Sequence, residues 1–115
     1  MKTPSKTEQR IRRHARIRAK AHGTAEKPRL AVHKSNASVF AQLIDDDKGV
    51  TIAAITSRKV KGATPAERAK AVGVEIAKLG LAKKVKKVVF DRGGFIYIGK
   101  IKAVAEGARE GGLQF

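Results

Sequence analysis

The spacing of apolar residues changes several times along this chain, and the order of the changes limits the folds that it can adopt. Alternation of apolar with other residues is typical of strands, whereas apolar residues three and four positions apart are typical of helices. Three strand-like runs, a helix-like run, a fourth and shorter strand-like run and a second helix-like run predict one α/β domain. The strand-like runs are 30–32, 39–44, 50–56 and 88–90, and the helix-like runs are 65–80 and 101–108.

Turn and capping residues mark the ends of several runs. The segment Asp45–Gly49 is typical of a hairpin loop, because Asp and Gly accept the backbone angles of tight turns. Thr64, Pro65 and Glu67 predict a helix start, since the threonine can cap, the proline fits the first turn and the glutamate completes a capping box. Gly80 predicts the end of that helix.

Two of the strand-like runs are apolar on both sides. In 39–44 apolar side chains occur at odd and even positions, so we expect that strand to be covered on both faces. The run 88–90 is typical of a buried parallel strand. The pair Gly111-Gly112 predicts the end of the last helix.

Positive charge is concentrated at the start of the chain. Of the 115 residues, 26 are Lys or Arg and 10 are Asp or Glu, which gives a net charge of +16, and residues 1–22 hold eight of these cations with one Glu. Exposed helices normally mix the two signs, so this excess predicts a polyanionic partner, nucleic acid before an anionic membrane surface. We expect 1–22 to be a basic arm that orders on RNA, although 5–21 has helix formers, and 23–115 to be a globular domain.

Several other functions are disfavoured. The chain has no cysteine, which excludes disulfides, thiolate zinc sites and cysteine nucleophiles. No apolar run approaches the roughly 20 residues that span a bilayer, and the Arg-rich start only loosely resembles a transit peptide. The three histidines are irregularly spaced, and the carboxylates of Asp45–Asp47 should point in different directions. We therefore expect no catalytic site, metal or cofactor.

Four segments carry a resemblance to a known family. They are Pro28-Arg29-Leu30-Ala31-Val32, Ser35-Asn36, Phe90-Asp91-Arg92-Gly93-Gly94 and Ala108–Phe115. Through these segments, and from about Arg10 to the last residue, the chain resembles the bacterial large-subunit ribosomal protein eighteen family. The resemblance implies a single three-layer α/β domain with a mixed sheet, similar to the ribonuclease H motif, and a basic N-terminal arm.

The same resemblance implies a function. Members of the family bind 5S rRNA, help to attach it to 23S rRNA in the central protuberance and lie near other large-subunit proteins. It thus implies a structural, cytoplasmic component of the large ribosomal subunit, with no membrane and no small-molecule substrate. The rival functions are a nuclease with the related fold and a nucleoid-type DNA-binding protein; metal-dependent RNA cleavage or a preference for duplex DNA would reveal them.

The expected RNA-binding residues fall in three groups, for which Arg suits phosphate and Ser or Asn suits the ribose hydroxyl. They come from the arm, from the first strand and its turn, and from the glycine loop after the last strand. The residues are Arg10, Arg12, Arg13, Arg16, Arg18 and Lys20; Arg29, His33, Lys34, Ser35 and Asn36; and Arg92, Gly93, Gly94, Tyr97 and Lys100.

Each of the last two groups has a structural alternative. Ser35 and Asn36 are equally suited to stabilising a turn, and the two glycines of 93–94 to permitting positive φ. Asp91 is a candidate to orient Arg92. Two positions depart from the family pattern: Ile98 stands where many relatives have a histidine, and His33 where relatives often have an aromatic residue.

Overall fold

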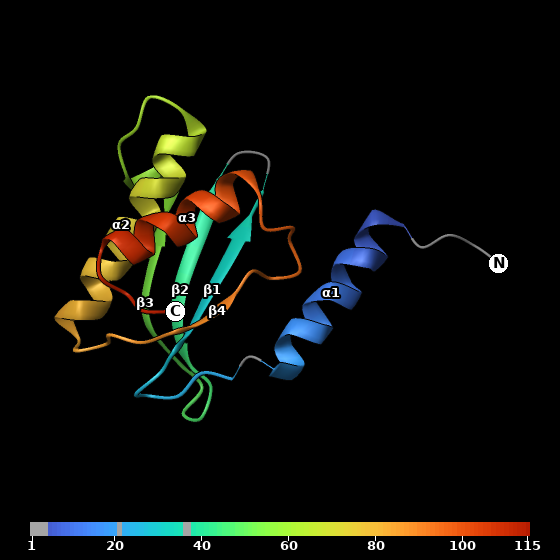
Figure 1. The fold of residues 1–115 in the computed structure, drawn as a ribbon, viewed down its shortest axis with the longest axis horizontal. Coiled ribbons are helices and arrows are strands. Elements are labelled where there is room, and N and C mark those ends of the chain that lie inside the picture. Colours follow the sequence, from blue (N-terminus) through green and yellow to red (C-terminus); the bar gives the residue numbers. More distant parts are fainter. Residues whose placement is uncertain (1–4, 21, 36–37) are drawn as a thin grey trace.

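The computed structural model describes residues 5–20, 22–35 and 38–115. In these residues a four-stranded mixed sheet is combined with three α-helices, which confirms the predicted α/β domain. The elements are α1 (Lys6–Lys20), β1 (Arg29–Lys34), β2 (Val39–Asp45), β3 (Val50–Thr56), a 3-10 turn (Ser57–Lys59), α2 (Pro65–Ala82), β4 (Val89–Asp91) and α3 (Gly99–Glu110). Helices α2 and α3 lie side by side over one face of the sheet, and α1 stands beside the β1–β4 side (Figure 1).

The sheet has the strand order β3-β2-β1-β4. β1, β2 and β3 form an antiparallel meander, and β4 pairs in parallel with β1 through Arg29↔Val89 to Ala31↔Asp91. The predicted parallel strand therefore exists, shifted by one residue. It is an outer strand, continued by a bridge between Lys87 and Gln114 near the C-terminus, and β3 is the outer strand of the other edge.

The alternation of β1 and β2 separates the two faces of the sheet. Leu30, Val32, Ala41 and Leu43 are at most 2% exposed and pack in the core beneath α2 and α3. The alternate residues 40, 42 and 44 of β2 are half-buried on the opposite face. The helix layer thus covers one face of β2 completely, and the second face, expected to be covered as well, stays partly open.

Thr64 and Pro65 begin α2 as predicted, but the Glu67 carboxylate bonds Ala63, one residue before the N-cap, where a capping box would use the N–H of Thr64 itself. The Thr64 hydroxyl accepts a hydrogen bond from the Glu67 N–H (3.2 Å), and the Glu67 carboxylate accepts one from the Ala63 N–H (2.8 Å). The predicted end at Gly80 is wrong, because the helix continues to Ala82. Gly80 is buried on its inner face, where its small size suits packing.

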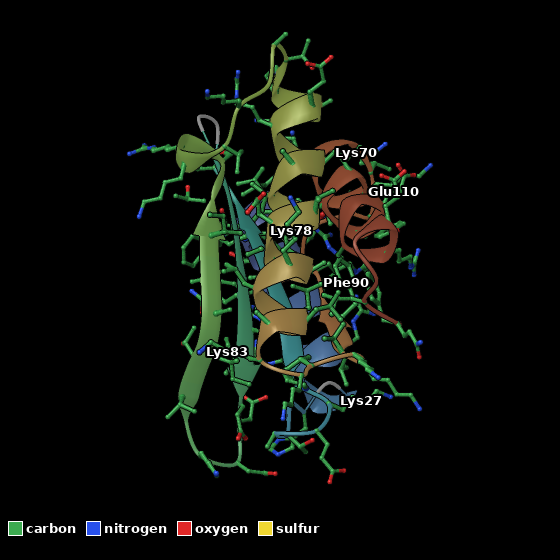
Figure 2. The ribbon with its side chains drawn as sticks, turned by 90° about the vertical axis from the view of Figure 1, so that its left-hand side faces the viewer. Lys27, Lys70, Lys78, Lys83, Phe90 and Glu110 are labelled. Carbon is green, nitrogen blue, oxygen red and sulfur yellow. The ribbon has the colours of Figure 1, made fainter. Side chains whose placement is uncertain are left out.

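Two glycines bring α2 and α3 into backbone contact. A Cβ atom at Gly73 of α2 would overlap the carbonyl oxygen of Val104, and one at Gly107 of α3 would overlap that of Lys70. An ion pair between Lys70 and Glu110 (3.2 Å) joins the two helices at their surface (Figure 2). The absence of side chains at these two positions therefore sets the helix separation.

We predict that Gly73→Ala destabilises the domain. The added methyl group has no space, and overpacking of this kind costs about 1–3 kcal/mol. Thermal unfolding should shift downward by roughly 4–8 °C per kcal/mol in a domain of this size. Lys78→Ala, an exposed change in the same helix, is the control and should stay within about 0.5 kcal/mol. An unchanged Tm for Gly73→Ala would show that the helices separate without cost.

Candidate nucleic-acid interface

The site is built around a buried arginine. The Arg29 side chain is 11% exposed. Its Nη1 donates to Asp91 (2.7 Å), while its Nε and Nη2 donate to the two carboxylate oxygens of Asp46 (3.0 and 3.1 Å). Asp46 also accepts the Gly23 N–H (2.7 Å), and Asp91, 1% exposed, accepts the Gly93 N–H (2.8 Å). One guanidinium thus joins β1 to the β2–β3 hairpin and to the end of β4.

This environment keeps Arg29 charged and its hydrogen-bond donors engaged by Asp46 and Asp91. Burial by itself would lower its pKa, but the hydrogen bonds and charges of Asp46 and Asp91 raise the pKa above its ordinary value. The hydrogen bonds engage all three guanidinium nitrogens, so the geometry favours a positioning role over a phosphate contact. Asp91 is held by Arg29, whereas the Arg92 side chain makes no hydrogen bond or ion pair with the residues that the structure describes.

The glycine loop after β4 supports α1. The glycines at 93–94 have φ angles of +64° and +79°, which disfavour other residues. A Cβ atom at Gly94 would also overlap the carbonyl oxygen of Arg10 in α1. The Arg13 Nε donates to the carbonyl oxygen of Gly94 (2.8 Å). The two glycines are therefore explained by the backbone angles of the loop and by its close contact with α1, under which Gly94 is buried.

A groove beside this loop brings distant residues together. Its volume is about 500 Å³. The Phe95 ring meets the His33 ring edge to face (5.3 Å between centroids), and the Arg10 guanidinium lies 5.3 Å from the centre of the Phe95 ring. We call this surface the basic groove; it is lined by Arg10, His33, Lys34, Ser35, Phe95 and Lys100.

A cavity of about 290 Å³ adjoins the groove, between α1 and the open sheet face. Its volume is near the lower limit for small-molecule pockets, about 300–1,000 Å³. Such a space, with aromatic walls and an amide at Gln42, suits a single planar group. The lining residues are Arg10, Ile11, His14, Arg29, Ala31, Val32, His33, Phe40, Gln42, Asp91, Gly93 and Phe95.

The first turn of α3 adds positive potential to the groove. Among the described residues, its N-cap Ile98 makes no side-chain capping hydrogen bond. Unpaired N–H groups and the helix dipole at such an end attract anions. Lys100 lies in the same turn and lines the groove. The exposed Ile98 side chain supplies no polar contact here.

Other expected RNA-binding residues lie around the groove or apart from it. Arg12 and Arg16 are exposed on α1. Ser35 lines the groove, but its hydroxyl also accepts the Ser38 N–H (3.2 Å) and so stabilises the turn. Tyr97 does not line the groove, and its hydroxyl accepts a bond from Arg109 (3.4 Å). Outside the described part lie Asn36 and the side chains of Arg18 and Lys20.

Three residues that shape the site were not among the binding residues predicted from the sequence. Phe95 forms the floor between His33 and Arg10. Gln42, a polar residue inside an apolar strand, is the signal that one face of β2 stays open, although both faces were expected to be covered. Asp46 looked like an ordinary hairpin residue, and its pairing with Arg29 across 17 positions has no local signal.

Membrane spans and metal sites are both absent from the part of the chain that the structure describes. No helix among these residues is long and apolar enough to cross a membrane. No three or more of their His, Cys, Asp and Glu side chains are grouped so that they could hold a metal ion.

We predict that Arg29→Met lowers the free energy of unfolding, because Arg29 has a structural role and is not a direct RNA contact. It leaves Asp91 buried without its cation, and breaking a buried pair costs about 3–5 kcal/mol. Urea unfolding measures the loss, and combining it with Asp46→Asn and Asp91→Asn should restore part of the stability. Lys34→Gln on the same strand should change stability by less than about 0.5 kcal/mol. Normal stability with lost RNA affinity would instead make Arg29 an RNA contact.

The chain is similar to known proteins over nearly its whole length. The family model described as ribosomal L18 of archaea, bacteria, mitochondria and chloroplast matches residues 4–115. The chain is 53% identical to large ribosomal subunit protein uL18 of Lactobacillus delbrueckii subsp. bulgaricus over 115 residues, with 97% of each chain covered. It is 52% identical to that of Staphylococcus aureus over 113 residues, covering 96% of this chain and 95% of the relative. The chain therefore belongs to the ribosomal L18 family and is a structural protein of the large ribosomal subunit, not an enzyme.

Proposed function

We propose that this protein binds 5S rRNA and helps to attach it to 23S rRNA, with other large-subunit proteins as neighbours. The observation that carries the proposal is the basic groove, which is lined by Phe95 and by cations from three distant segments, Arg10, Lys34 and Lys100. Charge from separate elements that converges on an aromatic floor is suited to folded RNA. The cytoplasm is the proposed location of this assembly.

The groove recognises RNA mainly through its backbone. Lys34 and Lys100 bind phosphates, and the first turn of α3 adds N–H donors. Ser35 offers a short donor to a ribose 2′-hydroxyl, which distinguishes RNA from DNA. An unpaired base can enter the adjoining cavity, where His33 and Phe95 supply aromatic surface. Backbone contacts give affinity, and the base gives selectivity.

Residues 1–22 act as the RNA-binding arm, and 23–115 as the domain that positions it. Arg12 and Arg16 point to solvent from α1, and contact with phosphates would remove their mutual repulsion. Arg13 holds the helix to the loop after β4. In this scheme the two loop glycines position the arm, and Arg92 adds a cation at the loop.

We predict specific, salt-sensitive binding to 5S rRNA. If six to ten phosphates are contacted, affinity should fall roughly 10³–10⁵-fold between 50 and 200 mM salt. Filter binding or fluorescence anisotropy with a 5S rRNA transcript measures this, with unrelated tRNA and duplex DNA of equal length as competitors. Equal affinity for tRNA or a preference for duplex DNA at physiological salt would contradict the proposal.

We predict that the three cations of the basic groove contribute directly to the affinity for 5S rRNA. Replacing its three cations by Gln should lower the affinity for 5S rRNA by at least about 10-fold. The salt slope should fall by about 2.7, taking roughly 0.9 for each phosphate contact. The variant, called the groove variant, is Arg10→Gln/Lys34→Gln/Lys100→Gln.

A matched control removes the same number of charges elsewhere. It replaces Lys48, Lys78 and Lys102, which are exposed on the hairpin and on the helix layer, by Gln. This control should bind 5S rRNA nearly as well as the original protein. Equal losses in the two variants would show that total charge, and not the groove, determines the affinity.

A further inference from the structure

The parallel pairing of β1 and β4 gives the sheet two distinct ends. Both strands finish at the basic groove, since Lys34 ends β1 and 92–100 follows β4. At the opposite end, Lys27 and Lys87 each lie two residues before the first pair, Arg29↔Val89. β1 has six residues, so the two ends are about 20 Å apart at roughly 3.3 Å per residue.

Exposed lysines gather at this second end. The segment 85–88 buries Val85 and Val88 in the core, which directs the two lysines between them to solvent. Lys83, at the end of α2, and Lys27 both lie in the lower half of Figure 2. We call this surface the lysine patch; it consists of Lys27, Lys83, Lys84, Lys86 and Lys87, all exposed.

The charge of the lysine patch is not balanced. None of its five side chains forms an ion pair with a described residue, whereas Lys70, Lys78 and Lys102 each lie near a carboxylate. Glu26 is the one acidic residue next to the patch in sequence. The acidic hairpin at 45–47 belongs to the same end but to the β2–β3 side.

The carboxylates of that hairpin are also occupied. Asp45 accepts N–H groups of the turn, Asp46 pairs with Arg29, and Asp47 contacts His22 (2.7 Å). The three carboxylates are held toward the hairpin and Arg29, and among the described residues none forms an ion pair with a lysine of the patch.

The backbone under the patch is fixed. The Val88 N–H donates to the Gln114 carbonyl (3.0 Å), the Gln114 N–H to the Lys86 carbonyl (2.8 Å) and the Val89 N–H to the Pro28 carbonyl (2.9 Å). These bonds hold the beginning of β4, the C-terminal segment and the approach to β1 together. The patch is therefore a preorganised surface and not a loose charged tail.

One lysine of the patch occupies a strained position. Lys84 has a φ of +64°, the single positive φ among the described non-glycine residues, where Gly or Asn is normally favoured. The dipole at the end of α2 favours cations at 83 and 84, but it does not account for Lys27 and Lys87 in extended segments. Glycine adopts a positive φ at a lower free energy than lysine does. The presence of lysine at 84 therefore indicates that its charge has a function.

We propose that the lysine patch is a second RNA site, which binds phosphates of an RNA duplex while the basic groove holds 5S rRNA. The inference deepens the proposed function and rests on it for the occupant of the groove. Lysines are point charges that contact phosphates without reading bases, and the patch includes no aromatic residue for stacking. Two sites at opposite ends of β1 let this small domain hold two RNA segments at once.

A capture experiment tests the proposal with the full chain. Biotinylated 5S rRNA is immobilised, saturated with protein and washed, and a fluorescent RNA duplex of about 16 base pairs is then added. The patch variant carries Lys83→Gln, Lys84→Asn, Lys86→Gln and Lys87→Gln; Asn tolerates positive φ. The control variant removes four exposed cations elsewhere, Arg58, Lys59, Lys61 and Lys102, each replaced by Gln.

The original protein and the control variant should capture the duplex on the 5S rRNA surface. The patch variant should hold 5S rRNA with less than about a threefold change and lose duplex affinity at least 10-fold. With four contacts, capture by the original protein should weaken roughly 100-fold between 50 and 200 mM salt. Unchanged capture by the patch variant, or equal losses in both variants, would overturn the proposal. Equal competition by a polyglutamate peptide would assign the patch to an acidic protein instead.

The same reagents separate failure of this inference from failure of the proposed function. If 5S rRNA does not bind in the first step, the proposed function fails. The lysine patch is then tested by duplex binding to the groove variant in solution. That variant should still bind the duplex, and adding the four patch changes should abolish the binding. Loss of duplex binding in the groove variant alone would show one site instead of two.

Discussion

The shared guanidinium of Arg29 is the interaction on which the remaining architecture depends. A buried cation must be compensated, and here the compensation comes from two carboxylates that are distant in sequence, Asp46 and Asp91. The hairpin and the end of β4 consequently cannot move independently of β1. Because the loop after β4 also carries Phe95 and supports α1, the electrostatics of one buried group determine the geometry of the basic groove.

The two faces of the sheet differ in chemistry because the apolar side chains that stabilise the fold lie on one face, beneath α2 and α3. α2 and α3 cover one face with a dry, apolar layer that owes its tight crossing to Gly73 and Gly107. All bulky apolar residues of β1 point that way, so the opposite face of β1 carries Arg29, Ala31 and His33. One face of the sheet is thus buried under helices (Figure 2), and we propose that the other face and the sheet ends serve recognition.

The order of elements, the α2 cap and the basic character of the surface could be predicted from the sequence, because each depends on neighbouring residues. Most of the groove could be predicted too, through the family resemblance. The pairing of Arg29 with Asp91 could not be predicted, since the two residues are 62 positions apart. Nothing local distinguishes Asp91 from a residue that orients Arg92. Gly80 was misread because packing against a sheet and ending a helix use the same residue type. Phe95 was not singled out from the sequence, because a buried aromatic residue and an aromatic residue beside a ligand surface give the same sequence signal.

The outer strand β3 has a consequence for the protein before assembly. β3 (Val50–Thr56) is an edge strand of the sheet, and its seven residues include neither a charged residue nor a proline. Outer strands of this kind can pair with a second copy and start aggregation unless something opposes the encounter. The net charge of +16 opposes it, because two copies repel each other over the length of the edge. The charge that we propose attracts RNA therefore also keeps unassembled copies of the protein apart, and this repulsion weakens as salt rises.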